Sequence, residues 1–468
     1  MIRILKLFGV SFLFLLLLYA LLLALPYVAH KKVPQSIKDR IQSVQYYSEL
    51  PGTERAAYID DNTEALLYRL NLIDQAQQEI IFSTFDFNVD EAGKDIMSAL
   101  LSAAERGVRI RMLVDGFSGM LDVNRSPWFE AMAAHENIQL KIYNPIRFSK
   151  PWKMQARLHD KYLIIDDQMY LLGGRNTFNL FLGDYTPVKN IDRELFIYET
   201  SGNPDASIRQ LKEYFQSVWE LPDAELYTKM RNQEKSDACI QWLTAHADAL
   251  RSAYPSAYES WDYEALTMET NRITLLHNPI NASNKEPWMW ETVCHLMGTG
   301  TKVTVYTPYI ICGKEMYADL TDLCKKTDLV EIITNDVASG ANPWGCTDYL
   351  NQKKKIWATG VRVYEYLGEH SSHSKAVLID DRMSIVGFYN MDMRSTYQDT
   401  ELMLAVDSPE LNAVIRKEAE INKTYSRYMT PEGTYINGEN YVPREMSAGK
   451  KLFYGIFRVL IIPFRRFL

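Results

Sequence analysis

The chain has 468 residues, of which 47% are hydrophobic and 24% charged, so it is a folded globular protein and not a disordered one. This length predicts two or three domains, because one hydrophobic core rarely serves so many residues. The net charge of −8 argues against nucleic-acid binding through bulk electrostatics, since phosphate-backbone affinity comes largely from lysine and arginine. The five cysteines are widely spaced and form no zinc-binding pattern, and we expect no metal or other cofactor.

The N-terminal segment predicts a membrane anchor. Residues 7–29 are uncharged and mostly apolar, and about 20 such residues suffice to span a bilayer as a helix. A cleaved signal peptide is the alternative, but the run is longer than a usual signal core. We therefore expect residues 1–32 to form a single span in the cell membrane. Basic residues are more frequent after the run than before it, which favours a cytoplasmic location for the rest of the chain.

The first half of the chain alternates predicted strands and helices. Residues 79–87 and 108–116 have strand patterns, 93–107 has a helical pattern, and 128–145 fits a helix followed by a strand. This alternation predicts βαβ units with helices against a sheet, and we expect one α/β lobe over residues 56–225. The following residues, 226–265, are rich in charge, and we expect them to form an irregular linker.

The second half repeats the same order of elements. Strand patterns at 302–310 and 330–336 enclose a helical pattern at 313–326, and 349–366 again fits a helix followed by a strand. The repeat predicts a second α/β lobe over residues 266–430, related to the first by pseudo-twofold symmetry.

The C-terminal segment, residues 431–468, ends in KKLFYGIFRVLIIPFRRFL, which mixes large apolar side chains with lysine and arginine. This last stretch, residues 450–468, is too short and too charged to span a bilayer comfortably. We expect it to lie in the headgroup layer of the membrane. A helix packed on the protein's own core is the alternative.

Each lobe carries one copy of the same polar motif. His159, Lys161 and Asp166 form H-x-K-x4-D in the first lobe, and a G-G-R-N sequence that ends at Asn176 follows. In the second lobe the corresponding residues are His373, Lys375, Asp380 and, at the end of G-F-Y-N, Asn390. Residues i and i+2 of a strand share one face, so each histidine is expected beside its lysine.

This set of residues fits phosphodiester cleavage. A neutral imidazole can attack phosphorus, and a second, protonated imidazole can give a proton to the departing alcohol. The lysines and asparagines would stabilise charge on the phosphate oxygens. Nearby glutamates or aspartates could fix the histidine tautomers, and the candidates are Glu194 and Glu401, which end the sequences IDRE and QDTE. Each lobe holds only one such histidine, so the two lobes must meet in a bilobal monomer.

The duplicated motif resembles that of the phospholipase D superfamily over residues 56–430. Segments such as TNDVASGANP and HSKAVLIDDRMSIVGFYN are similar to the bacterial cardiolipin synthase branch. The resemblance implies two similar lobes, each a mixed β-sheet flanked by helices, and a two-step transfer through a phosphatidyl-histidine without metal.

The resemblance also assigns roles to residues. His159 and His373 become nucleophile and acid, with His159 favoured as nucleophile; Lys161, Lys375, Asn176 and Asn390 bind phosphate; Asp166 and Asp380 support the motif strands; Glu194 and Glu401 orient the histidines. The chain departs from the family where a serine is usual, because Gly174 stands there in the first lobe and Phe388 in the second. Glycine keeps a backbone donor for substrate, whereas phenylalanine removes a hydroxyl and adds bulk.

Four functions are compatible with these residues. The first is a membrane-bound phosphatidyltransferase, a cardiolipin synthase that uses phosphatidylglycerol, with phosphatidylethanolamine as a further candidate substrate. The second is a phospholipase D hydrolase that releases phosphatidic acid. The others are a nucleic-acid phosphodiesterase, which the acidic chain disfavours, and an inactive membrane scaffold, which the two intact motifs disfavour.

Overall fold

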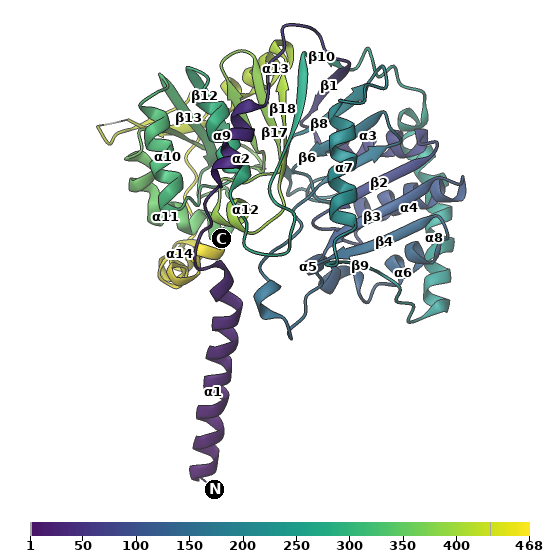
Figure 1. Ribbon diagram of the computed structural model, residues 1–468, viewed down its shortest axis with the longest axis horizontal. Helices are drawn as coiled ribbons and strands as arrows, with labels where there is room; N and C mark the ends of the chain where they lie inside the picture. The colour runs from purple at the N-terminus through teal and green to yellow at the C-terminus, as the bar shows by residue number, and fades with distance from the viewer. Residues whose placement is uncertain (1, 431) are drawn as a thin grey trace.

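The computed structural model describes residues 2–430 and 432–468, and it consists of two α/β lobes that stand side by side (Figure 1). Each lobe is built on a nine-stranded mixed sheet. In both sheets, three neighbouring strands are parallel and the other main pairings are antiparallel. The two-lobed fold expected from the repeat is confirmed.

The sheet of the first lobe has the order β10-β1-β8-β6-β5-β2-β3-β4-β9. Its strands are β10 Met268–Glu269, β1 Glu54–Ile59, β8 Glu194–Glu199, β6 Met169–Gly173, β5 Tyr162–Ile165, β2 Glu79–Thr84, β3 Arg109–Asp115, β4 Ile138–Tyr143 and β9 Ala224–Leu226. The larger helices of this lobe are α3 Asn62–Gln75, α4 Glu91–Glu105, α6 Pro127–Ala134, α7 Ser207–Trp219 and α8 Gln233–Ala253.

The sheet of the second lobe has the order β11-β18-β17-β16-β12-β13-β14-β19-β20. Its strands are β11 Arg272–His277, β18 Leu402–Asp407, β17 Met383–Gly387, β16 Ala376–Ile379, β12 Lys302–Tyr306, β13 Leu329–Asn335, β14 Arg362–Tyr366, β19 Ser426–Met429 and β20 Tyr435–Asn437. Its helices are α9 Trp288–Met297, α10 Lys314–Cys324, α11 Pro343–Trp357, α12 Met393–Tyr397 and α13 Pro409–Thr424.

The helices form three layers around the two sheets. The outer face of the first sheet is covered by buried side chains of α3, α4, α6 and α8. The outer face of the second sheet is covered in the same way by α9, α10 and α11. Between the sheets lies a shared core that contains residues of α7 and α13 and strands from both lobes. Burial of apolar surface therefore fixes how the lobes sit against each other.

Two short strand pairings cross from one lobe to the other. The strand β7 (Asn190–Ile191) pairs with β15 (Ser371–Ser372), and Leu158 forms a bridge with Thr400. The two pairings are equivalent under the pseudo-twofold symmetry, because each joins the residue before a motif histidine to the segment that enters β8 or β18. They bring each histidine to the other lobe.

Residues 226–265 are not the irregular linker that we expected. The strand β9 pairs with β4 at the edge of the first sheet, and α8 packs on α4 and α6. Its buried residues Cys239, Leu243 and Leu250 recur at helical spacing, a pattern that identifies an amphipathic helix despite the surrounding charge. The first lobe therefore extends through α8.

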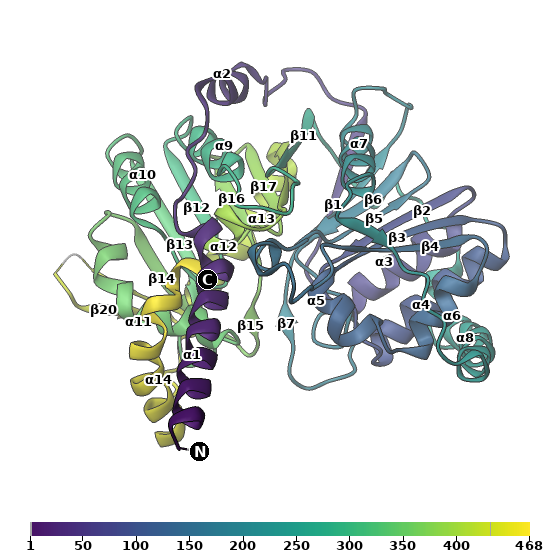
Figure 2. The same ribbon diagram turned by 60° about the horizontal axis from the view of Figure 1, so that its bottom comes forward.

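The two ends of the chain lie at the same end of the molecule (Figures 1 and 2). The helix α1 (Ile2–Ala24) continues into the 3-10 turn η1 (Leu25–Tyr27) and projects away from both lobes. The segment Lys6–Tyr27 is long and apolar enough to cross a membrane, and its most apolar part is not buried, whereas Tyr27 at its end packs against the lobes. These properties indicate a membrane protein. The C-terminal helix α14 (Ala448–Leu460) and the turn η5 (Ile462–Phe467) lie beside the base of α1.

Candidate active site

The two histidine motifs lie at corresponding places in the two sheets. His159 and Lys161 immediately precede β5, and His373 and Lys375 immediately precede β16. The carbonyl oxygen of Lys161 accepts a hydrogen bond from the Gly173 amide, and that of Lys375 accepts one from Gly387. These bonds place the loops that follow β6 and β17 beside the motif residues.

The imidazole of His159 is held by a carboxylate from the other lobe. Its Nδ1 lies 2.9 Å from Oε1 of Glu401, and its backbone amide donates to Oγ1 of Thr400. Burial, together with the nearby charges of Lys161 and Lys375, lowers the pKa of His159 well below its usual value. Burial raises the pKa of Glu401 well above its usual value. The pair therefore favours a neutral imidazole at pH 7.

His373 is held in the same way by the first lobe. Its Nδ1 lies 2.5 Å from Oδ2 of Asp192, and the ammonium of Lys375 lies 3.4 Å from the same oxygen. Burial lowers the pKa of His373 to about 4. Burial raises the pKa of Asp192, but Lys375 and His373 outweigh this effect and hold it at about 2. The carboxylate beside His373 is therefore ionised, and the pKa of this carboxyl is shifted in the opposite direction from that of Glu401 beside His159.

Glu194, which we expected to orient a histidine, lies elsewhere. Both of its carboxylate oxygens accept hydrogen bonds of 2.7 Å from Arg69, and the two side chains are buried. In the sheets Gly173 pairs with Glu194 and Gly387 pairs with Met403, so Glu194 corresponds to Met403. The residue that corresponds to Glu401 is Asp192, two positions earlier. Matching the sequence IDRE to QDTE therefore chose a residue two positions too late in the first lobe, Glu194 instead of Asp192.

The same register explains the glycine at position 174. A Cβ on Gly174 would overlap the carboxylate of Asp192. The serine that is usual in the family cannot be placed there while Asp192 contacts His373. Glycine thus makes room for the shorter carboxylate, and its replacement of serine is coupled to the use of Asp192.

Phe388, the other departure, forms one wall around the first motif. Its ring is fully buried and lies edge-on to His159, with 6.0 Å between ring centroids. The ammonium of Lys161 lies 5.2 Å from this ring and 5.3 Å from that of Phe85. Phe85 also packs against His159. The second motif is flanked differently, because Phe181 packs on His373. Phe388 thus contributes an apolar wall rather than a phosphate ligand.

The surroundings of Lys161 predict a specific pH dependence. Burial lowers the pKa of Lys161 to about 7. The ammonium is charged below that pKa, so phosphate binding and kcat/KM should fall about tenfold per pH unit above it. In Lys161→Arg the cation remains charged, and the decline should move to higher pH. Steady-state kcat/KM from pH 5 to 9 tests this; an unchanged alkaline limb in the variant would assign it to another group.

The two asparagines of the motifs lie in the loops beside the lysines. Asn176 and Asn390 are both largely buried. In the described part of the chain, neither Oδ1 atom has a hydrogen-bond partner. A buried amide oxygen without a partner is costly in a protein interior. Both amides lie beside a motif lysine, in a position from which they can bind a ligand.

The motif aspartates hold the sheets together and do not face the histidines. Asp166 follows β5 and has a φ of +52°. Its carboxylate accepts hydrogen bonds of 2.8–3.0 Å from the backbone amides of Gln77, Gln78 and Glu79. Asp380 has φ +45° and accepts the amides of Thr301 and Lys302 at the equivalent place. Each aspartate thus joins the end of its motif strand to the start of the neighbouring strand.

We expect Asp166→Ala to lower the free energy of unfolding by about 1–3 kcal/mol, because it removes three hydrogen bonds and places alanine at a positive φ. Asp166→Asn should lose less, since asparagine tolerates this conformation. Urea unfolding in detergent measures both effects. The turnover of the folded fraction should stay unchanged, and a selective loss of turnover would give Asp166 a catalytic role instead.

Sequence reasoning missed further residues around the first motif. Asp160 is fully buried between His159 and Lys161, and its Oδ1 accepts from Thr400 at 2.6 Å and from Tyr214 at 3.2 Å. Thr400 therefore joins the His159 backbone to Asp160 across the lobe boundary. Strand alternation predicts that Asp160 lies on the opposite face from His159. It does not predict the hydrogen-bond partners of Asp160, which are distant in the sequence.

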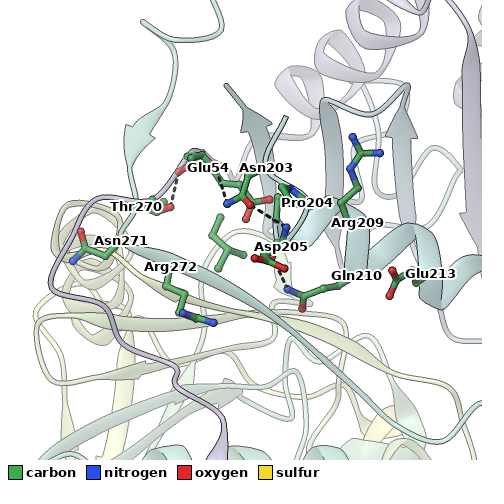
Figure 3. A pocket seen from close by; sticks show the side chains of 14 residues that line it. Glu54, Asn203, Pro204, Asp205, Arg209, Gln210, Glu213, Thr270, Asn271 and Arg272 are labelled. Carbon is green, nitrogen blue, oxygen red and sulfur yellow. Dashed lines mark hydrogen bonds between the residues drawn. The ribbon is translucent and has the colours of Figure 1, made fainter. Parts of the chain in front are cut away.

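A separate cavity of about 520 Å³ lies between the lobes at the start of α7 and β11 (Figure 3). Its lining includes Glu54, Arg209, Glu213 and Arg272, and it contains none of the motif residues. Charges of both signs line it, and Arg209 already pairs with Asp167 at 2.8 Å. This cavity is not the site that the motifs form.

Together, the paired motifs and the duplicated fold define an enzyme of the phospholipase D type, with one composite site at the lobe boundary. The family model described as "Cardiolipin synthase, PLD-like domain" matches residues 70–219 and 293–421. The chain belongs to this family. The two matched segments fall in the first and second lobe, respectively.

Individual relatives agree with this assignment. The chain is 23% identical to cardiolipin synthase C of Escherichia coli strain K12 over 415 residues, which cover 79% of this chain and 85% of that protein. It is 24% identical to cardiolipin synthase B of Salmonella typhi over 376 residues, covering 78% and 80%. The crystal structure of phosphatidylserine synthase from Haemophilus influenzae Rd KW20 matches with a TM-score of 0.62 at 16% identity, covering 92% and 99%, which shows the shared fold.

Proposed function

We propose that this protein is a membrane-bound phosphatidyltransferase that makes cardiolipin, by moving a phosphatidyl group from one phospholipid to a hydroxyl of phosphatidylglycerol. The observation that carries the proposal is the cross-lobe pairing of His159 with Glu401 and of His373 with Asp192 beside two buried lysines. The membrane helix and the similarity to cardiolipin synthases support a lipid substrate. Phosphatidylethanolamine is a further candidate donor.

In the first step, Nε2 of His159 attacks phosphorus and the bond from phosphorus to the leaving alcohol breaks. The imidazole would become cationic on phosphorylation unless it loses the Nδ1 proton. The ionised form of Glu401, whose Oε1 lies 2.9 Å from Nδ1, takes this proton, and burial, which raises the pKa of Glu401, favours the protonated product. The imidazole of the phosphatidyl-histidine is then neutral, and the phosphoryl group keeps one negative charge, which the two buried lysines compensate.

His373 is the partner that protonates the leaving alcohol. In the protein without substrate, burial lowers the pKa of His373 to about 4, so the imidazolium that donates this proton has to form with substrate bound, stabilised by the anionic phosphate and by the ionised carboxylate of Asp192, 2.5 Å from Nδ1. In the second step, the same imidazole removes a proton from the hydroxyl of phosphatidylglycerol, which then attacks the phosphatidyl-histidine. Lys161, Lys375, Asn176 and Asn390 bind the phosphate oxygens in both steps.

One catalytic site uses both lobes of one chain, so we propose a monomer as the catalytic unit. We place the lobes on the cytoplasmic side of the membrane, because Lys31, Lys32, Lys38 and Arg40 follow the span while Arg3 and Lys6 precede it. Labelling of an introduced surface cysteine in intact cells tests this, since a membrane-impermeant reagent should not reach it.

The function is tested by expression in cells that lack cardiolipin synthase, followed by lipid profiling. The intact protein should restore cardiolipin, and His159→Ala and His373→Ala should not. If phosphatidic acid rises while cardiolipin stays absent, the protein is a hydrolase and the transferase proposal fails. If neither lipid changes although the protein is folded and membrane-bound, it is a scaffold.

A further inference from the structure

Two apolar surfaces outside the active site flank the base of the membrane helix α1. One is the outer face of α14, where Leu452, Ile456, Val459 and Leu460 are more than half exposed. The other is the loop of residues 144–156 in the first lobe, which carries Phe148 and Trp152. Their exposed fractions are 67% and 43%. Such side chains are costly to hold in water unless something covers them.

The helix α14 is fixed by its inner face, so its outer face is not free to turn inward. Tyr454 is buried, the ring of Phe457 lies 4.6 Å from that of Trp344, and Lys450 donates to the carbonyl of Ala338. The exposed apolar residues recur at positions i, i+4, i+7 and i+8, which is one helical face. One side of α14 therefore packs on the second lobe, and the other presents an apolar stripe.

The loop of residues 144–156 lies against α1. Oη of Tyr19, within the apolar helix, lies 3.5 Å from Sδ of Met154, and the turn η3 (Pro151–Lys153) contacts α1. Tyr19 is five residues before the end of α1, so the loop reaches past the point where the span leaves the lobes. Trp152, in η3, thus lies at the level of the membrane helix, and Phe148 precedes it by four residues in the same loop.

Both surfaces are joined to the catalytic residues by short segments. The loop leads through Leu158 to His159, and Tyr27 at the end of η1 packs in the same core as Leu158. On the other side, the carbonyl of Leu468 accepts from the amide of Arg394 in α12, a few residues before Glu401. Figure 2 shows α1 and α14 side by side in front of the lobes.

We propose that α14 and the loop of residues 144–156 form, with α1, a single membrane-docking surface that is covered by the same bilayer that α1 enters. The basic side chains on and beside these segments, Lys150, Lys451 and Arg466, suit an anionic lipid surface. Docking at both sides of α1 holds the loop that leads to His159 at the depth of the lipid headgroups. Lipids can then reach the active site without leaving the bilayer. This last step rests on the function proposed above; the docking itself does not.

Fluorescence in liposomes tests the docking without activity. The full-length variant Ile456→Trp is reconstituted in liposomes with and without brominated phosphatidylcholine. Ile421→Trp is the control, because Ile421 is also exposed (48%) but lies on α13, away from the ends of the chain. Brominated lipid should quench about half or more of the emission added at position 456 and little of that at 421. Trp152→Phe should likewise remove tryptophan emission that brominated lipid quenches in the intact protein. Equal quenching at 456 and 421 would overturn the proposal.

Activity on two forms of lipid tests the consequence. Leu452→Glu with Ile456→Glu, and Phe148→Glu with Trp152→Glu, should each lower turnover of lipid in vesicles at least about tenfold, and leave turnover of monomeric short-chain lipid within about twofold. Val414→Glu with Ile421→Glu on α13 serves as the matched control. Equal losses on both forms of lipid would contradict a docking role. Absence of any lipid product with the intact protein would instead refute the proposed function and leave the fluorescence test valid.

Discussion

His373→Ala is expected to release one equivalent of nitrophenolate from bis(4-nitrophenyl) phosphate and then to stop, whereas His159→Ala should release none. On natural phospholipid both variants should lose activity by about 10³-fold or more. The difference between the substrates comes from the leaving group. Nitrophenolate leaves without a proton, so the first step no longer needs an acid, but it still needs the nucleophile.

The stalled His373→Ala enzyme should carry a phosphorylated imidazole at position 159. The second step needs a base to activate the acceptor, and that base is the missing His373. Stopped-flow release of nitrophenolate gives the size of the burst, and mass spectrometry of the quenched protein locates the phosphoryl group. A burst in His159→Ala with modification at His373 would reverse the two roles.

Asp192→Asn and Glu194→Gln should produce opposite kinds of defect. Asp192→Asn should lower kcat by about 10²–10³-fold, because an amide cannot stabilise the imidazolium of His373. Glu194→Gln should lower the free energy of unfolding by about 3–5 kcal/mol, because it leaves the buried guanidinium of Arg69 without its ionised partner. The turnover and pH profile of its folded fraction should remain those of the intact protein.

Kinetics against pH and urea unfolding of the same preparations separate the two defects. Gly174→Ser provides a further check, because the added side chain must displace the Asp192 carboxylate from its place beside His373. It should therefore resemble Asp192→Asn in kcat. If Glu194→Gln loses turnover with normal stability while Asp192→Asn is unaffected, the assignment of Asp192 to His373 is wrong.

The pH dependence of stability is linked to the same carboxylates. Lys375 and His373 hold the pKa of Asp192 at about 2, below its value of about 4 in an unfolded chain. A depressed carboxylate pKa contributes stability above the unfolded value, which is lost as the pH falls from about 4 towards 2. Burial raises the pKa of Glu401, so its contribution has the opposite sign and does not favour the folded state at neutral pH.

The sequence by itself determined the duplication, the class of chemistry and the positions of His159, Lys161, His373 and Lys375. These follow from local patterns, because strand alternation and helical periodicity are set by neighbouring residues and the two motifs are short and identical in spacing. The family resemblance rests on the same short segments, and the match over residues 70–219 and 293–421 agrees with it.

Only the tertiary structure decided which carboxylate serves which histidine. The segment from Gly173 to Asp192 is five residues longer than that from Gly387 to Glu401, so matching by sequence chose Glu194, which has the right residue type and the same strand face. Backbone pairing between β6 and β8 fixes the register instead, and a shift of two residues preserves the face while moving the side chain along the strand. The exchange of carboxylates between lobes depends on contacts between residues more than 180 positions apart, which no local pattern encodes. The glycine at 174 follows from the place that Asp192 takes in this exchange.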